Sequence, residues 1–176
     1  MNNAMSRHTR NKGIALNLDW IDSVQMNRSA IEHRCSTMTK RRSIKKDWQA
    51  AWLLKSLSCI DLTTLSSDDT HERVMRLCAK ARQPLRPELA DFLGLKGIKT
   101  NVAAVCVYHS FVKTAVKALQ NSAIPVAAVS TGFPHGLNSL PRRIEEIRDS
   151  IDDGAEEIDI VITRAHVFSK KLAGSL

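Results

Sequence analysis

An aspartate lies inside an apolar, strand-like segment near the end of the sequence. Residues 155–163 read AEEIDIVIT, which places Asp159 between two isoleucines. Strand interiors disfavour aspartate, and burying an unpaired charge costs more than a short apolar segment can return. Asp159 therefore needs a charged partner or a chemical task, and we interpret it as a candidate functional residue.

Other reactive or polar side chains end or follow three further apolar segments. Asp61 and Thr63 end the first, Cys106 lies near the end of the second, and His135 follows the third in a Gly/Pro loop. In parallel α/β folds the working residues stand at the carboxyl ends of strands, so these positions are candidates for one shared site. Each also has a plainer interpretation: Asp61 as a turn cap, Cys106 as a small core residue, and His135 as a loop residue.

Four apolar segments of strand length alternate with amphipathic helices. The predicted strands span residues 57–62, 102–108, 125–130 and 156–162. Because they lack apolar–polar alternation and are separated by helices, they predict a parallel sheet covered by helices. The alternatives are an open doubly wound sheet and part of a (β/α)₈ barrel, which needs eight strands and typically ~250 residues. No glycine-rich or Walker phosphate loop follows the first strand, so a nucleotide-binding open sheet gains no support.

Apolar residues three or four positions apart predict the helices that accompany these strands. The helix after the first strand begins with a capping-box-like pair, Asp69 and Glu72. A short helix is predicted within residues 83–99, and another from Arg164. The predicted buried stripes are Ile44, Trp48, Ala51 and Trp52; Val74, Leu77, Cys78 and Ala81; Val112, Ala115, Val116 and Leu119; and Leu140, Ile144, Ile147 and Ile151.

The formal net charge of +8 is concentrated near the N-terminus. Residues 1–50 hold 10 Lys/Arg against 4 Asp/Glu, so we interpret residues 1–39 as a basic, partly disordered extension. The basic run over residues 40–46 leaves nucleic-acid binding open as a weaker alternative to a solvated helix face. The four cysteines have no metal-binding spacing, and Cys59 and Cys106 lie in apolar segments, where a free thiol acts as a small hydrophobe. We therefore expect a reducing compartment, the cytoplasm, with the nucleus as an alternative. No apolar run is long enough to span a bilayer.

Five motifs together carry a family resemblance that no single one of them would support. In chain order they are KDWQAAWLLK (46–55), IDLTTL (60–65), AAVCVY (103–108), GFPHG (132–136) and EIDIVI (157–162). Their order and spacing resemble the deoxyribose-phosphate aldolase family, class I aldolases with a (β/α)₈ barrel. The resemblance covers about residues 14–168.

The resemblance implies an aldehyde lyase that reversibly cleaves 2-deoxy-D-ribose 5-phosphate to D-glyceraldehyde 3-phosphate and acetaldehyde, in deoxyribonucleotide catabolism. It implies no metal or other cofactor. A lysine on strand six forms a Schiff base as the electron sink, and a second lysine on strand seven lowers its pKa. By motif, Asp159 resembles the strand-four acid that donates and accepts protons, and Cys106 the substrate-contacting thiol of strand two. Asp61 and Thr63 resemble strand-one residues that orient a lysine or a substrate hydroxyl.

The chain ends before the family's strands five to eight, and none of its lysines lies within a predicted strand. We therefore expect a truncated family member, the N-terminal half of the barrel over residues 40–176. It would lack the Schiff-base lysine and the phosphate-binding loops and would be inactive as this chain alone. His109 replaces the proline that usually follows the family's strand-two tyrosine. The alternative is a non-catalytic protein that binds a second copy, a full-length aldolase or another partner through an open sheet edge.

Overall fold

A computed structural model describes residues 14–15, 17–41, 43–98 and 100–169. The start of the predicted extension and the tail from Lys170 lie outside these residues. The chain separates into two compact units, one up to Ile44 and one from Lys45. The division predicted between residues 39 and 40 stays a prediction.

The described part of the first unit forms two exposed helices. α1 spans Leu18–Ser23, and α2 spans Arg28–Arg41. The Asn17 side chain caps α1, and neither helix contains a buried residue. Lys40 and Arg41 lie in the last turn of α2, where their charges complement the negative end of the helix dipole.

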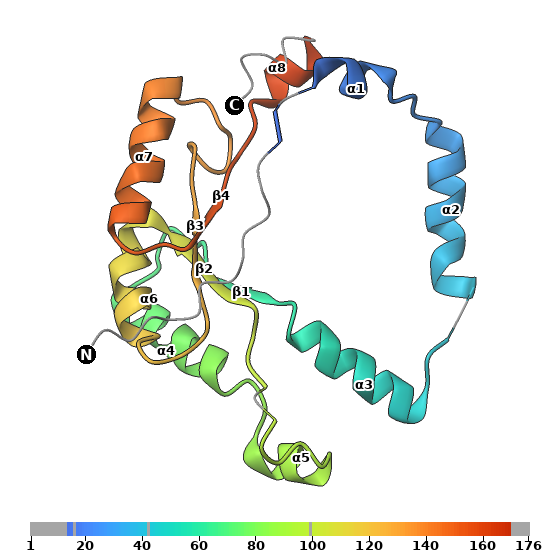
Figure 1. The fold of residues 1–176 in the computed structure, drawn as a ribbon, viewed down its shortest axis with the longest axis vertical. Coiled ribbons are helices and arrows are strands. Elements are labelled where there is room, and N and C mark those ends of the chain that lie inside the picture. Colours follow the sequence, from blue (N-terminus) through green and yellow to red (C-terminus); the bar gives the residue numbers. More distant parts are fainter. Residues whose placement is uncertain (1–13, 16, 42, 99, 170–176) are drawn as a thin grey trace. The chain divides into compact units, whose positions relative to one another are not determined.

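The second unit is built on a four-stranded parallel sheet (Figure 1). Its strands are β1 (Asp61–Thr63), β2 (Ala104–Tyr108), β3 (Val126–Val129) and β4 (Glu157–Asp159). They lie in chain order, with Thr63 opposite Cys106 and Val129 opposite Asp159. A doubly wound sheet reverses its strand order at a switch point, whereas a (β/α)₈ barrel adds each strand beside the last. The observed order therefore selects the barrel alternative.

Helices α4, α6 and α7 lie on one side of this sheet and leave its other face to loops (Figure 1). The helical segments of the unit are α3 (Lys46–Leu57), α4 (His71–Arg82), α5 (Pro87–Phe92), the 3₁₀ turn η1 (His109–Phe111), α6 (Val112–Ala118), α7 (Leu140–Asp152) and α8 (Arg164–Phe168). α5 and α8 confirm the two short helices predicted from the sequence. Within the described ranges, no helix has the length and apolar character needed to cross a bilayer.

The first predicted strand, residues 57–62, is wrong at both ends. Leu57 is the last residue of α3, and the amides of Cys59 and Ile60 bond back to carbonyls of the last helical turn at 3.0 and 3.2 Å. These local bonds satisfy backbone groups that a strand would otherwise have to pair. The fourth strand also ends earlier than predicted, at Asp159.

The capping pair predicted from Asp69 and Glu72 is wrong as well. Thr70 is the N-cap of α4, and its hydroxyl accepts the Arg73 amide at 3.3 Å. The Asp69 carboxylate instead accepts the Thr64 hydroxyl at 2.8 and 2.9 Å and pairs with the Arg73 guanidinium at 3.2 Å. Asp69 therefore ties the segment after β1 to the first turn of α4.

Two apolar clusters pack on opposite faces of the sheet. Larger side chains of the central strands, such as Val105 and Val107, pack with residues of α4 and α6. Smaller side chains, Ala104, Cys106 and Ala127, occupy the other face. This alternation follows the two-residue period of a strand. It could not be read from the apolar–polar pattern, because both sets are apolar.

Helical periodicity predicts burial correctly for α4 and α6 but not for α3 and α7. Val74 and Cys78 on α4 and Val112 on α6 are almost fully buried. In contrast, Trp48 on α3 is 75% exposed, and Ile151 on α7 is 53% exposed. Spacing determines which residues share a helix face, whereas burial also requires an element that packs on that face.

The free edge at β4 leads us to expect that the 176-residue chain self-associates. In the described part β4 pairs only with β3, and Ile160 and Ile162 are 52% and 45% exposed. Exposed apolar edges with unpaired backbone groups favour association. Sedimentation should therefore detect oligomers or aggregates, and amide-proton exchange should be fast in β4.

A matched pair of variants distinguishes association through the β4 edge from nonspecific association of exposed apolar side chains. Ile160→Lys should reduce association, whereas Met75→Lys, at a position 49% exposed on α4, should leave it unchanged. A monodisperse monomer with well-protected β4 amides would contradict the expectation.

Candidate active site

Cys106 and Asp159 meet on the sheet face opposite the helices, although β3 lies between their strands. The Cys106 thiol donates a hydrogen bond to Oδ2 of Asp159 at 3.5 Å. Neighbouring strands are ~4.8 Å apart, so two side chains meet across a middle strand only where that strand presents a small residue. Ala127, which pairs with Cys106, carries only a methyl group there. The contact thus depends on the strand order and on a small side chain in β3.

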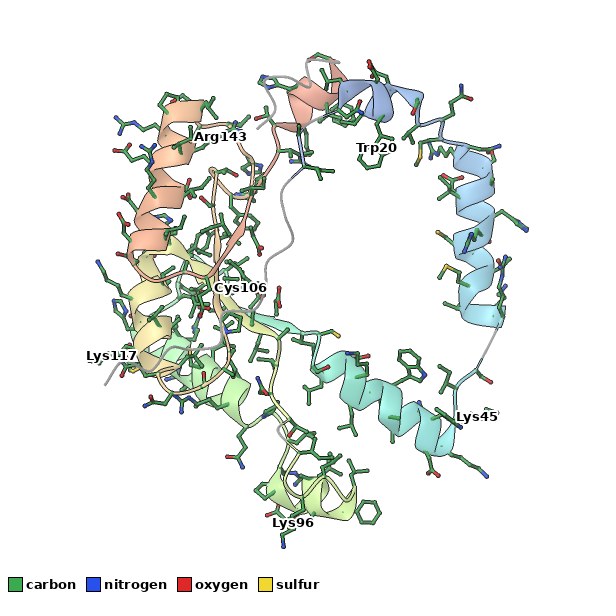
Figure 2. All side chains as sticks on the ribbon, viewed as in Figure 1. Trp20, Lys45, Lys96, Cys106, Lys117 and Arg143 are labelled. Atoms are coloured by element: carbon green, nitrogen blue, oxygen red, sulfur yellow. The ribbon has the colours of Figure 1, made fainter. Side chains whose placement is uncertain are left out.

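β1 adds Asp61 and Thr63 to the same face. They lie opposite Ala104 and Cys106 in the parallel register, and both side chains are exposed. The Thr63 hydroxyl donates to the Asp61 carbonyl at 2.8 Å. Asp61 is the first residue of β1, so the expectation that it ends the strand is wrong. Residues from three strands nevertheless gather on one face, with Cys106 near the middle of the sheet (Figure 2).

The Cys106 thiol is held in its neutral form. Burial raises the pKa of Cys106 to about 12, and the charge of Asp159 and its hydrogen bond add to this shift. The charge of Asp61 raises this pKa further, while a hydrogen bond with Thr63 lowers it. Because the thiolate is the nucleophilic form, Cys106 suits a contact and hydrogen-bonding role, not covalent attack.

The residues after β3 organise the loop that leads to α7. His135 is exposed, and its backbone amide donates to the Gly132 carbonyl at 3.1 Å, which fits the loop interpretation. Thr131 is buried, and its φ of 62° is unusual for a non-glycine residue. Ser130 is buried, and its hydroxyl is the buried side-chain oxygen without a hydrogen-bond partner in the described part. The structure gives no physical account of that hydroxyl.

The assembled face offers carboxylates, hydroxyls and a neutral thiol, but no amine. The four strands contain no lysine. Among the residues with described placement, no group of three or more His, Cys, Asp or Glu side chains could hold a metal ion. Carboxylates accept and return protons, and hydroxyls hydrogen-bond polar ligands. The face therefore offers groups that can exchange protons and hydrogen-bond a polar ligand.

Sequence comparison relates the chain to curated aldolases, although no protein-family model matches it. A deoxyribose-phosphate aldolase of Mus musculus is 52% identical over 169 residues, and those of Homo sapiens and Bos taurus are 50% identical. Each match covers 94% of this chain and 52% of the relative. Over nearly all of its own length the chain is similar in sequence to these deoxyribose-phosphate aldolases. It spans about half the length of the curated relatives it matches.

Solved structures share the fold of this chain. A protein from Coccidioides immitis, described as a deoxyribose-phosphate aldolase, aligns with a TM-score of 0.59 at 23% identity, covering 92% of this chain and 54% of its own. A protein of the same description from Toxoplasma gondii aligns with a TM-score of 0.53 at 21% identity, covering 72% and 44%. At these identities the likeness shows the fold alone, and it agrees with four βα units of a barrel.

Sequence reasoning missed two buried polar residues beside the candidate site. Arg143 and Thr163 are each 6% exposed. The Arg143 guanidinium donates to the Asn138 carbonyl at 2.7 Å and to the Thr163 hydroxyl at 2.5 Å. A faint signal existed, because Arg143 and the buried Ser150 are seven residues apart and share a helix face. The isoleucine stripe of α7 is the stronger sequence pattern, and it predicts a different buried face.

The neutral state of Cys106 can be measured by alkylation. With a pKa of about 12, Cys106 should react far more slowly than the exposed Cys35 and Cys59 at pH 8, and its rate should still be rising at pH 11. Asp159→Asn removes a negative charge beside the thiol and should lower its pKa, which accelerates alkylation by about threefold to tenfold.

Asp152→Asn, an exposed change at the end of α7, serves as the matched control and should leave the Cys106 rate unchanged. Mass spectrometry of iodoacetamide-treated chain reads each cysteine separately. Alkylation of Cys106 at the rate of Cys35 would show that the thiol is neither buried nor beside a carboxylate.

Proposed function

We propose that this chain supplies the β1–β4 part of a deoxyribose-phosphate aldolase active site, in which Asp159 carries a proton. The observation that carries the proposal is the 3.5 Å contact between the Asp159 carboxylate and the Cys106 thiol. It sets an exposed acid on the sheet face that the helices leave free, beside Asp61 and Thr63.

The proposed reaction is the reversible cleavage of 2-deoxy-D-ribose 5-phosphate to D-glyceraldehyde 3-phosphate and acetaldehyde. Such a retro-aldol step removes a proton from a hydroxyl, breaks a carbon–carbon bond, and later returns a proton to an enamine carbon. A carboxylate that is exposed to the ligand and hydrogen-bonded on one side suits both transfers. The names of the curated relatives support this substrate.

We place the reaction in deoxyribonucleotide catabolism in the cytoplasm. The cysteines support a reducing compartment, since Cys35, Cys59, Cys78 and Cys106 are all free thiols. The reaction as proposed uses acid–base and Schiff-base chemistry and needs no metal ion.

The electron sink for carbon–carbon cleavage must come from elsewhere in an aldolase. Schiff-base catalysis needs an amine that reaches the substrate carbonyl, and the strands β1–β4 carry none. We therefore propose that the nucleophilic lysine and the phosphate-binding loops belong to the half of the relatives' length that this chain does not span. The 176 residues by themselves would then bind and position, but not cleave.

A partner-binding role is the second candidate, and exposed apolar side chains favour it. Leu140 and Ile151 on α7 are 52% and 53% exposed, and Ile160 and Ile162 follow β4 at the sheet edge. A polypeptide that continues the barrel would cover both regions, because closure pairs every strand edge. Mixing the chain with a relative's strands five to eight and measuring complex formation tests this role independently of turnover.

The first functional prediction concerns covalent chemistry. Borohydride treatment of the 176-residue chain with deoxyribose 5-phosphate should trap no adduct, because positioning residues cannot replace the amine nucleophile. A full-length curated relative treated in parallel provides the positive control. A mass shift on one lysine of the 176-residue chain would overturn the assignment of the nucleophile to another segment.

The second functional prediction concerns Asp159. In a chain completed with the missing half of a relative, Asp159→Asn should preserve folding but lower turnover by about 10²–10⁴, the usual effect of removing a general acid–base. Asp152→Asn should keep turnover within error, because that carboxylate lies on the exposed end of α7. Near-normal activity of the Asp159 variant would reduce this residue to a structural role.

A further inference from the structure

Asp159 sits on a strand that the sheet anchors weakly. β4 has three residues, and in the described part it pairs only with β3. The last bond of this ladder runs from the Ser130 amide to the Asp159 carbonyl at 2.9 Å. Beyond Asp159 no strand continues, so the direction of its side chain depends on what holds the residues that follow.

Side chains of the β3–α7 connection hold those residues. The Thr131 hydroxyl accepts the Val161 amide at 2.6 Å and donates to the Val161 carbonyl at 3.0 Å. The Thr163 hydroxyl donates to the Gly136 carbonyl at 2.9 Å and accepts the Arg143 guanidinium. The β3–α7 connection therefore hydrogen-bonds to the chain two and four residues after Asp159. These bonds hold the chain beyond the point where the β-ladder ends.

Arg143 (Figure 2) is central to the second of these two attachments, the one at Thr163. Its Nε donates to the Asn138 carbonyl, and its Nη2 donates to the Gly136 carbonyl and the Thr163 hydroxyl. The Arg143 guanidinium makes no ion pair within the described ranges, although the residue is only 6% exposed. Burying a charge without a counter-charge is costly, so packing alone does not explain an arginine here. The planar fork joins two loop carbonyls and one hydroxyl through two separate nitrogens held in a fixed geometry, which the single ammonium nitrogen of a lysine does not reproduce.

We propose that Arg143 is a positioning residue that fixes the chain after β4 and thereby holds the Asp159 carboxylate against Cys106. The inference rests on the proposed function in one respect only, because that function assigns proton transfer to Asp159. Its geometric part, the dependence of the Asp159–Cys106 contact on Arg143, stands whether or not the chain belongs to a working aldolase.

The Cys106 thiol serves as a built-in reporter of this geometry. Arg143→Met keeps much of the side-chain volume but removes the donors, so Asp159 should move away from the thiol. The Cys106 alkylation rate at pH 9 should then rise by about threefold or more, because the thiolate is no longer opposed by a neighbouring carboxylate. In an Asp159→Asn background, Arg143→Met should cause no further rise.

Controls distinguish positioning from general loosening of the fold. Arg142→Met removes the neighbouring, exposed arginine, which pairs with Glu145, and should leave the rate unchanged. Cys78, 1% exposed between the sheet and the helices, should stay unreactive in every variant. Arg143→Lys should behave like Arg143→Met, because it keeps the charge but loses the fork.

Each other outcome overturns the proposal. An equal rise in both backgrounds, or alkylation of Cys78 together with Cys106, would show that Arg143 only stabilises the fold. An unchanged Cys106 rate in Arg143→Met would show that Asp159 is held without it. Full restoration by lysine would assign the effect to charge and not to the hydrogen-bond fork. Rapid alkylation of Cys106 in the parent chain would show that the Cys106–Asp159 contact does not exist. Absent turnover in a completed aldolase would instead count against the proposed function alone.

Discussion

The packing of valines from the two central strands against α4 and α6 is the constraint on which the site depends. Val105 and Val107 are fully buried between sheet and helices, and Val74 and Val112 meet them from the helical side. Burying a valine side chain stabilises the fold by about 1.5–3 kcal/mol, an upper estimate because unfolded chains are already partly collapsed. This face of the sheet is therefore fixed, and the two-residue period of a strand directs the intervening residues to the other face.

The small size of those intervening residues makes the site face chemically useful. Ala104 and Ala127 present only methyl groups on this face, and Cys106 reaches the Asp159 carboxylate across β3. The same closeness keeps the thiol protonated, since burial and a neighbouring negative charge both disfavour the thiolate. Cys106 is therefore a hydrogen-bond donor, and the carboxylate is the group left able to exchange protons.

Apolar side chains near β4, at the edge of the described sheet, are more exposed than those near its central strands. Ile144 on α7 and Ile160 after β4 are 39% and 52% exposed, whereas equivalent apolar positions on α4 and α6 are buried. The chain matches about half the length of its curated relatives, and a closed barrel covers each strand edge and helix flank with its next unit. Thr131 and Arg143 hydrogen-bond the residues that follow β4, at Val161 and Thr163.

The sequence by itself determined the elements whose signals are local. Unbroken apolar runs located β2 and β3, and helical spacing located the buried stripe of α4, because both depend on side-chain period alone. Asp159 stands out in the sequence because a carboxylate between isoleucines is anomalous in an apolar run, although in the structure it is the exposed last residue of β4. Tertiary structure decided the rest: the Thr70 cap, the start of β1 at Asp61, and the burial of Arg143. Caps and strand ends are settled by competition among nearby hydrogen-bond partners. A buried arginine becomes tolerable only when the fold assembles carbonyls and a hydroxyl around it. The order of residues carries only a faint signal of this, the shared helix face of Arg143 and Ser150.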